Sequence, residues 1–478
     1  MMQAAPSPNA PASSDARVAG DRSKHRRPRI RAALLTRARL ALLAATALYA
    51  LSIYFAYVEY LYPAWEYMGF TFRPLGASEV VVVVTLLTAA ASTMPVGLSR
   101  ASAVILMLLY LVVFVPGIVV TFCLDAHRLD QYLPFALALT AVSCVAGWLC
   151  SRSPASRPGP RLDPSNAFLA VLSSLWVAMA ALLLLEYRGV MSFVALDNVY
   201  EQRAAGASTG TLIAYVQTYF SNVVNPALIA AGLVYKRRLS LLMGVSGCVL
   251  MYAINAQKVV LLLPLAMVAL DALLRGRLAL RYGVSTALLV FGTLTFYAAS
   301  RWETDVVAGA LAVFLVNRTI AIPGLTLSQY FDHFSTEAFT YWSHVKGLDL
   351  LIDAPAKFSA DPLWPGLGYI LGDRLFGMPE FNMNANLFAG DGIAAAGSAG
   401  IIVVGLALIA FLLVLDWVSS RWNQRFVVLV VFPVGLSLTN GHLFTTLLSF
   451  GGLFWVLTFA LAGGSRQAAA SRQEIRLP

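Results

Sequence analysis

The chain of 478 residues is 59% hydrophobic, only 12% charged, and carries a formal net charge of +10 at pH 7. Because a soluble domain has roughly 25% charged residues, this composition excludes an ordinary soluble protein. The apolar residues fall in blocks of about 18 to 25, long enough to cross a bilayer core of about 30 Å. The sequence therefore predicts an all-α integral membrane protein without an attached soluble domain.

The first segment, 1–39, is rich in Ala, Pro, Ser and Arg, a composition that predicts disorder. In a soluble protein its positive charge would suggest nucleic acid. Here the charge lies directly before an apolar block, as in a positive-inside membrane anchor. We expect a cytoplasmic tail and no nucleic-acid partner; binding to anionic lipid or nucleic acid is the less favoured alternative. The basic residues are Arg17, Arg22, Lys24, Arg26, Arg27, Arg29, Arg31, Arg37 and Arg39.

About twelve transmembrane helices are expected, nine within 40–299 and three within 393–463. A short periplasmic loop near 186–210 and a large one at 300–392 interrupt the series. The expected spans lie near 40–62, 78–97, 101–122, 132–150, 166–185, 211–234, 239–255, 258–274, 280–299, 393–418, 426–442 and 444–463.

Arginine and lysine residues set the orientation of these spans, because cytoplasmic loops carry an excess of both. With the N-terminus inside, every inward connection is basic, and an even number of spans places the tail 464–478 in the cytoplasm. We therefore expect a multi-pass protein of the bacterial inner membrane with both termini cytoplasmic. The inward connections hold Arg100; Arg152, Arg157 and Arg161; Lys236, Arg237 and Arg238; Arg275, Arg277 and Arg281; Arg421 and Arg425; and Arg466, Arg472 and Arg476.

The four cysteines and five histidines show no ligand spacing such as CxxC or HExxH. The cysteines lie in or beside apolar blocks, where a thiol behaves as a small hydrophobic group. The sequence predicts no disulfide, no metal site and no cofactor.

The large loop at 300–392 differs in composition from the spans, because it contains five prolines, three tryptophans and ten carboxylates. Its apolar run Val306–Val316 has eleven residues, too few to span, so a re-entrant or surface-lying helix is predicted there. Loops of this length are usually functional or disordered. Aromatic rings and carboxylates suit sugars, and arginines suit phosphates. Both kinds together favour a lipid-linked saccharide as ligand, although many transporters share this composition.

Several segments in a fixed order resemble one family, the oligosaccharide repeat-unit polymerases, also called Wzy-type O-antigen polymerases. They are DNVYEQR at 197–203, NPALIAAGLVYKRR at 225–238, YAINAQKVVLLLP at 252–264, RTIAIPG at 318–324, SQYFDHF at 328–334 and NANLFAGDGIAAAGSAG at 384–400. Two segments depart from the family pattern. Ala256-Gln257-Lys258-Val259 stands where relatives often have Gly-x-Lys-Ser, and Gly390-Asp391-Gly392 stands where a more aromatic stretch is expected.

The resemblance implies a metal-independent, GT-C-like glycosyltransferase of the periplasmic face. Its donor would be a growing glycan on undecaprenyl pyrophosphate and its acceptor a single repeat unit on the same carrier. A flippase and a chain-length regulator would be its protein partners, and membrane lipid would surround it. The chemistry requires cations at the pyrophosphate and a base at the acceptor hydroxyl.

The resemblance also assigns roles to individual residues. Pyrophosphate binding is expected at Arg203, Lys258 and Arg318, with Arg374 and Arg301 as second choices. Candidate bases are Asp391 and His333, followed by His344, Glu303 and Glu337. Sugar contacts are expected from Tyr200, Tyr330, Asn384 and Asn386. Each has an ordinary structural alternative, such as snorkelling for Lys258 or helix capping for Asp391.

Other functions share this architecture. An O-antigen ligase would move the finished glycan to another acceptor, a flippase or secondary transporter would carry the lipid-linked unit, and a non-catalytic assembly partner would do neither. Transporters usually show internal repeats, which this chain lacks, and its polar residues concentrate in one outer loop. The sequence favours the polymerase and does not specify the sugar, the linkage or the polysaccharide.

Overall fold

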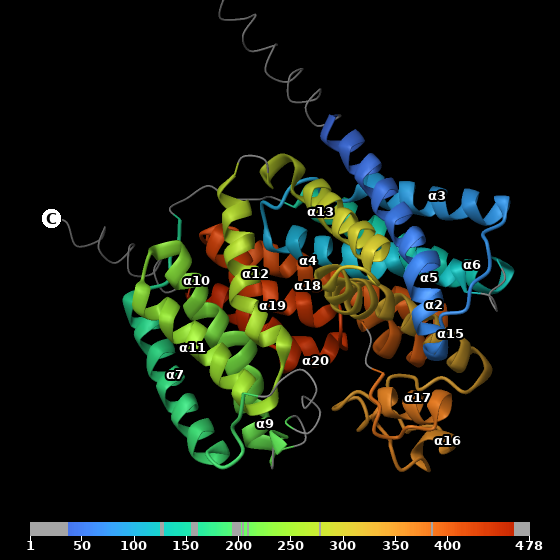
Figure 1. Ribbon diagram of the computed structural model, residues 1–478. Coiled ribbons are helices and arrows are strands. Elements are labelled where there is room, and N and C mark those ends of the chain that lie inside the picture. Colours follow the sequence, from blue (N-terminus) through green and yellow to red (C-terminus); the bar gives the residue numbers. More distant parts are fainter. Residues whose placement is uncertain are drawn as a thin grey trace, which may run out of the picture.

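The computed structural model describes residues 37–124, 129–153, 161–193, 202, 205–207, 210–276, 279–383 and 386–462 (Figure 1). Apart from one isolated bridge between Leu162 and Trp422, these residues form helices and the turns that join them. The expectation of an all-α protein is therefore confirmed. Of the two predicted tails, 1–39 and 464–478, the first lies outside the described residues up to residue 36 and the second lies outside them entirely.

The elements follow each other along the chain with short π- or 3-10-helical segments, labelled η, between several of the α-helices. After an initial helix from Arg37 they are η1 (Tyr57–Leu61), α2 (Tyr62–Trp65), η2 (Glu66–Met68), α3 (Ala77–Thr93), α4 (Ala101–Leu109), η3 (Tyr110–Phe114), α5 (Val115–Cys123), α6 (Leu129–Arg152), α7 (Asn166–Tyr187), α9 (Thr211–Tyr219), η5 (Phe220–Val224), α10 (Asn225–Tyr235), α11 (Arg238–Asn255), α12 (Lys258–Arg275), α13 (Ala279–Arg301), α14 (Val306–Leu311), η6 (Ala312–Ala321), α15 (Ile322–Thr336), α16 (Ala356–Ser359), α17 (Leu367–Phe376), η7 (Phe388–Ile393), α18 (Ala394–Ser419), α19 (Gln424–Leu438) and α20 (Leu443–Leu448), before a final helix, Gly452–Ala462.

Within the described residues, eight helices are long and apolar enough to cross a membrane. The protein is therefore membrane-embedded, as expected, whereas the number of twelve spans stays a prediction. The expected spans at 211–234 and 258–274 are helical but are not among the eight. Three other expected spans correspond to shorter apolar helices. The eight are Arg37–Met68, Ala101–Cys123, Leu129–Arg152, Asn166–Tyr187, Arg238–Asn255, Ala279–Arg301, Val306–Thr336 and Phe388–Ser419.

The centre of the fold is the helix Ala101–Cys123, formed by α4, η3 and α5. Its mean hydropathy is 2.9, and every residue of its most apolar window is buried inside the protein. A helix that is hydrophobic all round must be enclosed by other elements. Here α19 and α18 cover α4, and α15 covers α5.

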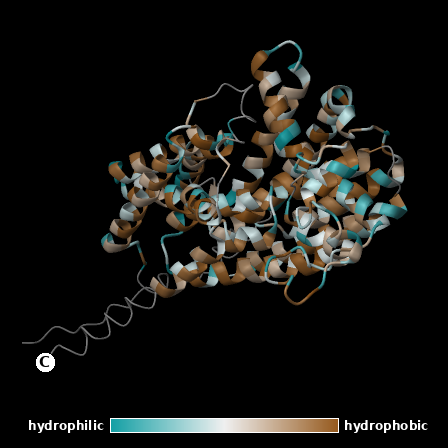
Figure 2. Ribbon diagram, turned by 90° about the horizontal axis from the view of Figure 1, so that it is seen from below, coloured by the Kyte–Doolittle hydropathy of each residue, from teal (hydrophilic) through white to brown (hydrophobic). Residues whose placement is uncertain are grey.

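The outer helices carry a lipid-facing surface. Figure 2 shows hydrophobic residues along these helices, and side chains such as Leu239, Leu265 and Leu406 are largely exposed. Exposed apolar surface on this scale marks contact with a membrane or a partner.

The basic connections gather at one end of the helix bundle. Arg425 Nη2 lies 2.7 Å from Asp271 Oδ2 and also donates to the carbonyl of Leu233, while Arg275 Nη2 lies 2.7 Å from the same carboxylate. These ion pairs bring the ends of α10, α12 and the start of α19 together. At the same end, Arg39 donates to the carbonyls at the end of α3. Every second loop of a multi-pass membrane protein lies on the same side of the membrane, so basic loops that alternate along the sequence are expected at one end.

The helix that begins at Val306 is longer than the apolar run Val306–Val316. It continues through Asn317 and Arg318 to Thr336 and reaches 31 residues, long and apolar enough to cross a membrane. The prediction that this segment is too short to span is therefore wrong. Asn317 is buried within η6, so the polar residue does not end the helix.

The same long helix nevertheless begins and ends beside one end of the first helix. Trp302, just before α14, donates from Nε1 to the carbonyl of Glu59 at 3.2 Å. Gln329 in α15 donates from Nε2 to the carbonyl of Met68, also at 3.2 Å. Glu59 and Met68 lie far from Arg39 along the first helix, so both flanks of α14–α15 lie at the end opposite the basic connections. We call this the outer end; α16 and α17 lie away from the start of the first helix as well (Figure 1).

The helix Phe388–Ser419 is broken near its start. Ala396 has φ −160° and ψ 31°, and Gly397 has φ 59° and ψ −137°. The break brings η7 against α18 so closely that a Cβ on Gly400 would overlap the carbonyl oxygen of Gly392. The first two turns, which hold Asp391, therefore form a separate short helical segment at the outer end.

We expect Gly397→Ala to destabilise the protein, because an L residue rarely adopts this backbone conformation and its Cβ would lie 3.1 Å from the Phe339 ring. A forced conformation of this kind costs about 1–3 kcal/mol. Thermal unfolding of the purified protein in detergent measures the effect as a lowered Tm. Gly189→Ala, where no atom lies within 4 Å, is the matched control. Equal Tm values for Gly397→Ala and wild type would contradict the break.

Candidate functional site

The broken helix is tied to the outer loop by its own freed carbonyl groups. The backbone N–H groups of Thr340 and Tyr341 donate to the carbonyls of Ala394 and Ala395, at 2.8 and 3.1 Å. Backbone groups that a helix break releases must find partners within the protein at membrane depth. The loop residues supply these partners, and the same contact places the following residues of the loop beside η7.

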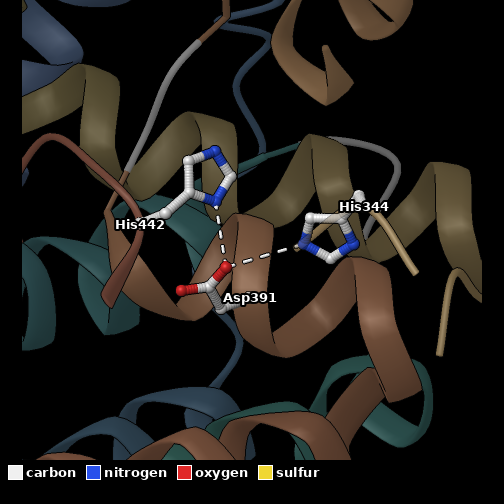
Figure 3. A group of neighbouring side chains, drawn as sticks. All are labelled: His344, Asp391 and His442. Carbon is white, nitrogen blue, oxygen red and sulfur yellow. Dashed lines mark ion pairs between the residues drawn. The ribbon is translucent and has the colours of Figure 1, made fainter. Parts of the chain in front are cut away.

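Asp391 lies in η7 with its carboxylate almost fully buried. Its Oδ2 accepts a hydrogen bond from the backbone N–H of Phe444 at 3.1 Å, which ties η7 to the start of α20. Its Oδ1 faces two imidazoles, which approach it from adjacent sides (Figure 3). His344 Nε2 lies 3.5 Å from this oxygen and His442 Nδ1 lies 3.3 Å from it. We call Asp391, His344 and His442 the carboxylate–histidine cluster.

The hydrogen bonds of Thr340 determine the proton position on His344. The hydroxyl of Thr340 donates its single proton to the Ala394 carbonyl at 3.1 Å, so it accepts from Nδ1 of His344 at 2.9 Å. Burial lowers the pKa of His344, although Asp391 partly opposes this effect. These bonds place a proton on Nδ1 of His344, and Nε2 faces Asp391.

The position of His442 depends on the glycine before Asp391. A Cβ on Gly390 would overlap the imidazole of His442. Any other residue at this position would displace the ring from the carboxylate. His442 is the residue that the sequence did not single out, because it lies 51 positions after Asp391 and belongs to no ligand motif. Only the packing of η7 against the start of α20 brings the two together.

A second group of candidate residues gathers around the turn between α11 and α12. Gln202 donates from Nε2 to the carbonyls of Val190, Ala253 and Ile254 at 2.8 to 3.0 Å. A Cβ on Gly206 would overlap the carbonyl of Ile254. The chain on both sides of Arg203 is therefore held against the end of α11, four residues before Lys258. Arg203 and Tyr200 themselves lie outside the described residues.

Lys258 begins α12 and contacts the long outer helix. Its Nζ lies 4.8 Å from the centre of the Phe314 ring in η6, within the range of a cation–π interaction. Arg318 follows Phe314 by four residues in the same helix and is exposed. Residues at this spacing are neighbours on a helix surface. The structure thus places Lys258 against the same helix that carries Arg318, about one turn before it.

Arg374 and His333 belong to another part of the outer loop. Arg374 pairs with Asp361 at 3.2 Å, and both line a cavity of about 520 Å³ together with Lys357 and Asp373. His333 is not part of the carboxylate–histidine cluster, so the structure does not bring the two first-choice candidate bases, Asp391 and His333, into one group.

The candidate sugar-binding residues have their polar atoms engaged within the protein. Tyr330 is buried, and its hydroxyl lies 3.4 Å from the carbonyl of Met383. Asn386 is also buried; it donates to the Pro323 carbonyl and accepts from the N–H of Phe388. Both side chains hold α15 and η7 together. Asn384 lies outside the described residues.

These features define a membrane-embedded, all-α protein with a buried carboxylate–histidine cluster at its outer end. We call the nearby group of Lys258, Phe314 and Arg318 the cationic region. No family model, no curated protein and no solved structure matches the chain.

We expect Gln202→Ala to loosen the segment that carries Arg203, because the variant loses the side-chain hydrogen bonds to three carbonyls. Each such bond contributes about 1 kcal/mol. Hydrogen–deuterium exchange at the Gly206 amide should accelerate roughly 10- to 100-fold, since each 1.4 kcal/mol corresponds to about a factor of ten. Gln131→Ala, an exposed glutamine, is the matched control. Unchanged exchange at Gly206 would show that Gln202 does not hold this segment.

Proposed function

We propose that the protein is a polysaccharide polymerase, which joins undecaprenyl-pyrophosphate-linked repeat units on the periplasmic face of the bacterial inner membrane. The product would be an O-antigen, a capsule or an exopolysaccharide. The resemblance of residues 197–400 to the repeat-unit polymerases suggests this reaction.

The observation that carries the proposal is the convergence of the cationic segments. The segment around Arg203, the start of α12 at Lys258 and the helix face that bears Phe314 and Arg318 meet at the outer end. They come from three regions of the sequence. Outward loops usually carry few Lys and Arg residues, so positive charges at this end are unusual. Cations placed together in this way can bind a pyrophosphate and stabilise its charge as it leaves.

The carboxylate–histidine cluster provides a place for the acceptor hydroxyl to lose its proton. It is linked to the cationic region by one continuous helix, since η6 carries Arg318 and the adjoining α15 packs against η7. In this proposal the leaving pyrophosphate lies at the cationic region and the acceptor hydroxyl at the cluster. The apolar outer helices leave the polyprenyl tails in the bilayer.

The test is complementation of a strain that lacks the polymerase of the same locus, read as a glycan ladder on a gel. We expect Arg203→Ala, Lys258→Ala and Arg318→Ala each to lower chains longer than one repeat by at least about tenfold. Loss of a charge-assisted hydrogen bond removes roughly 1.5–3 kcal/mol, and each 1.4 kcal/mol is about tenfold in rate. Arg281→Ala, an exposed arginine at the opposite end of α13, is the control at matched membrane levels.

The outcome separates the polymerase from its rivals. A single capped repeat unit with the arginine and lysine variants supports polymerisation. If deletion of the protein removed even that single capped unit, an O-antigen ligase or a flippase would replace the polymerase. A full ladder with all three variants would contradict the assigned role of the cations.

A further inference from the structure

Three ligand atoms of the carboxylate–histidine cluster converge on one point. Asp391 Oδ1, His344 Nε2 and His442 Nδ1 all lie within 4.8 Å of one another. Ligands about 2.1 Å from a tetrahedral zinc ion are separated by about 3.4 Å. The two nitrogen–oxygen distances, 3.5 and 3.3 Å, agree with that separation.

The two imidazole nitrogens that face Asp391 are buried and lack hydrogen-bond partners among the described residues. Neither His344 Nε2 nor His442 Nδ1 has a hydrogen-bond partner in the part of the chain that the structure describes, although both atoms are buried. The His344 side chain is only 4% exposed. Thr340 accepts a hydrogen bond from Nδ1 of His344, which leaves Nε2 facing Asp391 Oδ1 as a ligand atom. A buried polar atom without a hydrogen-bond partner is costly, and a metal ion between Nε2 and the carboxylate would satisfy both groups.

The surroundings match those of a metal ligand set. A metal-binding histidine almost always donates its second N–H to an oxygen that fixes the ring, and Thr340 accepts this bond from His344. Asp391 is fixed in turn by Phe444 through its other oxygen. Gly390 leaves the space in which the His442 ring stands beside the carboxylate. Two nitrogens and one carboxylate oxygen suit zinc and exclude an all-oxygen site for magnesium or calcium.

We propose that Asp391, His344 and His442 bind a divalent transition-metal ion of the zinc class, with at least one coordination position open. To reach tetrahedral coordination, the two imidazoles need only move closer to each other. His442 is the more exposed of the two, at 24% against 4%, and lies directly before α20. The proposal does not rest on the polymerase function and differs from the metal-independent chemistry that the resemblance implies. Three protein ligands with an open position are typical of catalytic rather than structural zinc sites.

The test uses the full-length protein purified in detergent, stripped with a chelator and titrated with zinc chloride by calorimetry. We expect one ion per chain, with a Kd that rises at least about tenfold in His442→Ala and in Asp391→Asn. Asp391→Asn retains an oxygen for the Phe444 N–H, so the fold is preserved. His333→Ala, outside the cluster, should bind as the wild type does. Magnesium chloride should not compete.

A second variant pair tests the role of Thr340. Thr340→Val removes the acceptor of the His344 proton and should weaken zinc binding by about 10- to 100-fold, whereas Thr340→Ser should restore it. Cobalt chloride provides an independent readout on the wild type alone, because a site with nitrogen ligands gives a visible absorption band that His442→Ala abolishes. Absence of zinc binding by the wild type, or equal binding by Asp391→Asn, would overturn the proposal. Because these readouts involve no glycan, they fail or succeed separately from the ladder assay.

Discussion

The helix break at Ala396 and Gly397 is the feature on which the outer end depends. It releases two carbonyls, which Thr340 and Tyr341 of the outer loop satisfy, and it separates η7 from the rest of α18. Unsatisfied backbone groups are costly at membrane depth, so the loop is held where the break requires it. The backbone geometry of one glycine thereby fixes the position of His344 relative to Asp391.

Helical segments with π-type hydrogen bonding recur along this side of the protein. Segment η6 carries Arg318 and continues directly into α15, whereas η7 carries Asp391 and is separated from most of α18 by the break at Ala396 and Gly397. Such segments are rare in helices and concentrate at functional sites. The long outer helix α14–α15 connects them, since it contacts Lys258 through Phe314 and packs against η7. The helix Val306–Thr336 therefore contacts both the cationic region and the carboxylate–histidine cluster.

Hydropathy and charge were sufficient to predict the helical class, the membrane location and the gathering of basic loops, because these properties depend on local composition. They did not predict that the helix extends to Thr336. The polar residue Asn317 suggests the end of an apolar helix, and only the structure shows that Asn317 is buried. His442 was beyond sequence reasoning, because its place beside Asp391 arises from packing between distant segments. The predicted sugar contacts Tyr330 and Asn386 have their polar atoms engaged in internal bonds that composition does not reveal.

The proposed reaction needs no soluble domain, because the outer end combines cations for a leaving pyrophosphate with a buried group for proton removal. The most direct measurement is the reaction of the purified, reconstituted protein with an undecaprenyl-pyrophosphate-linked repeat unit, analysed by mass spectrometry. The account predicts glycans of two or more repeats on one carrier, with one undecaprenyl pyrophosphate released for each new linkage. Recovery of the unchanged repeat unit from an active, folded preparation would contradict it.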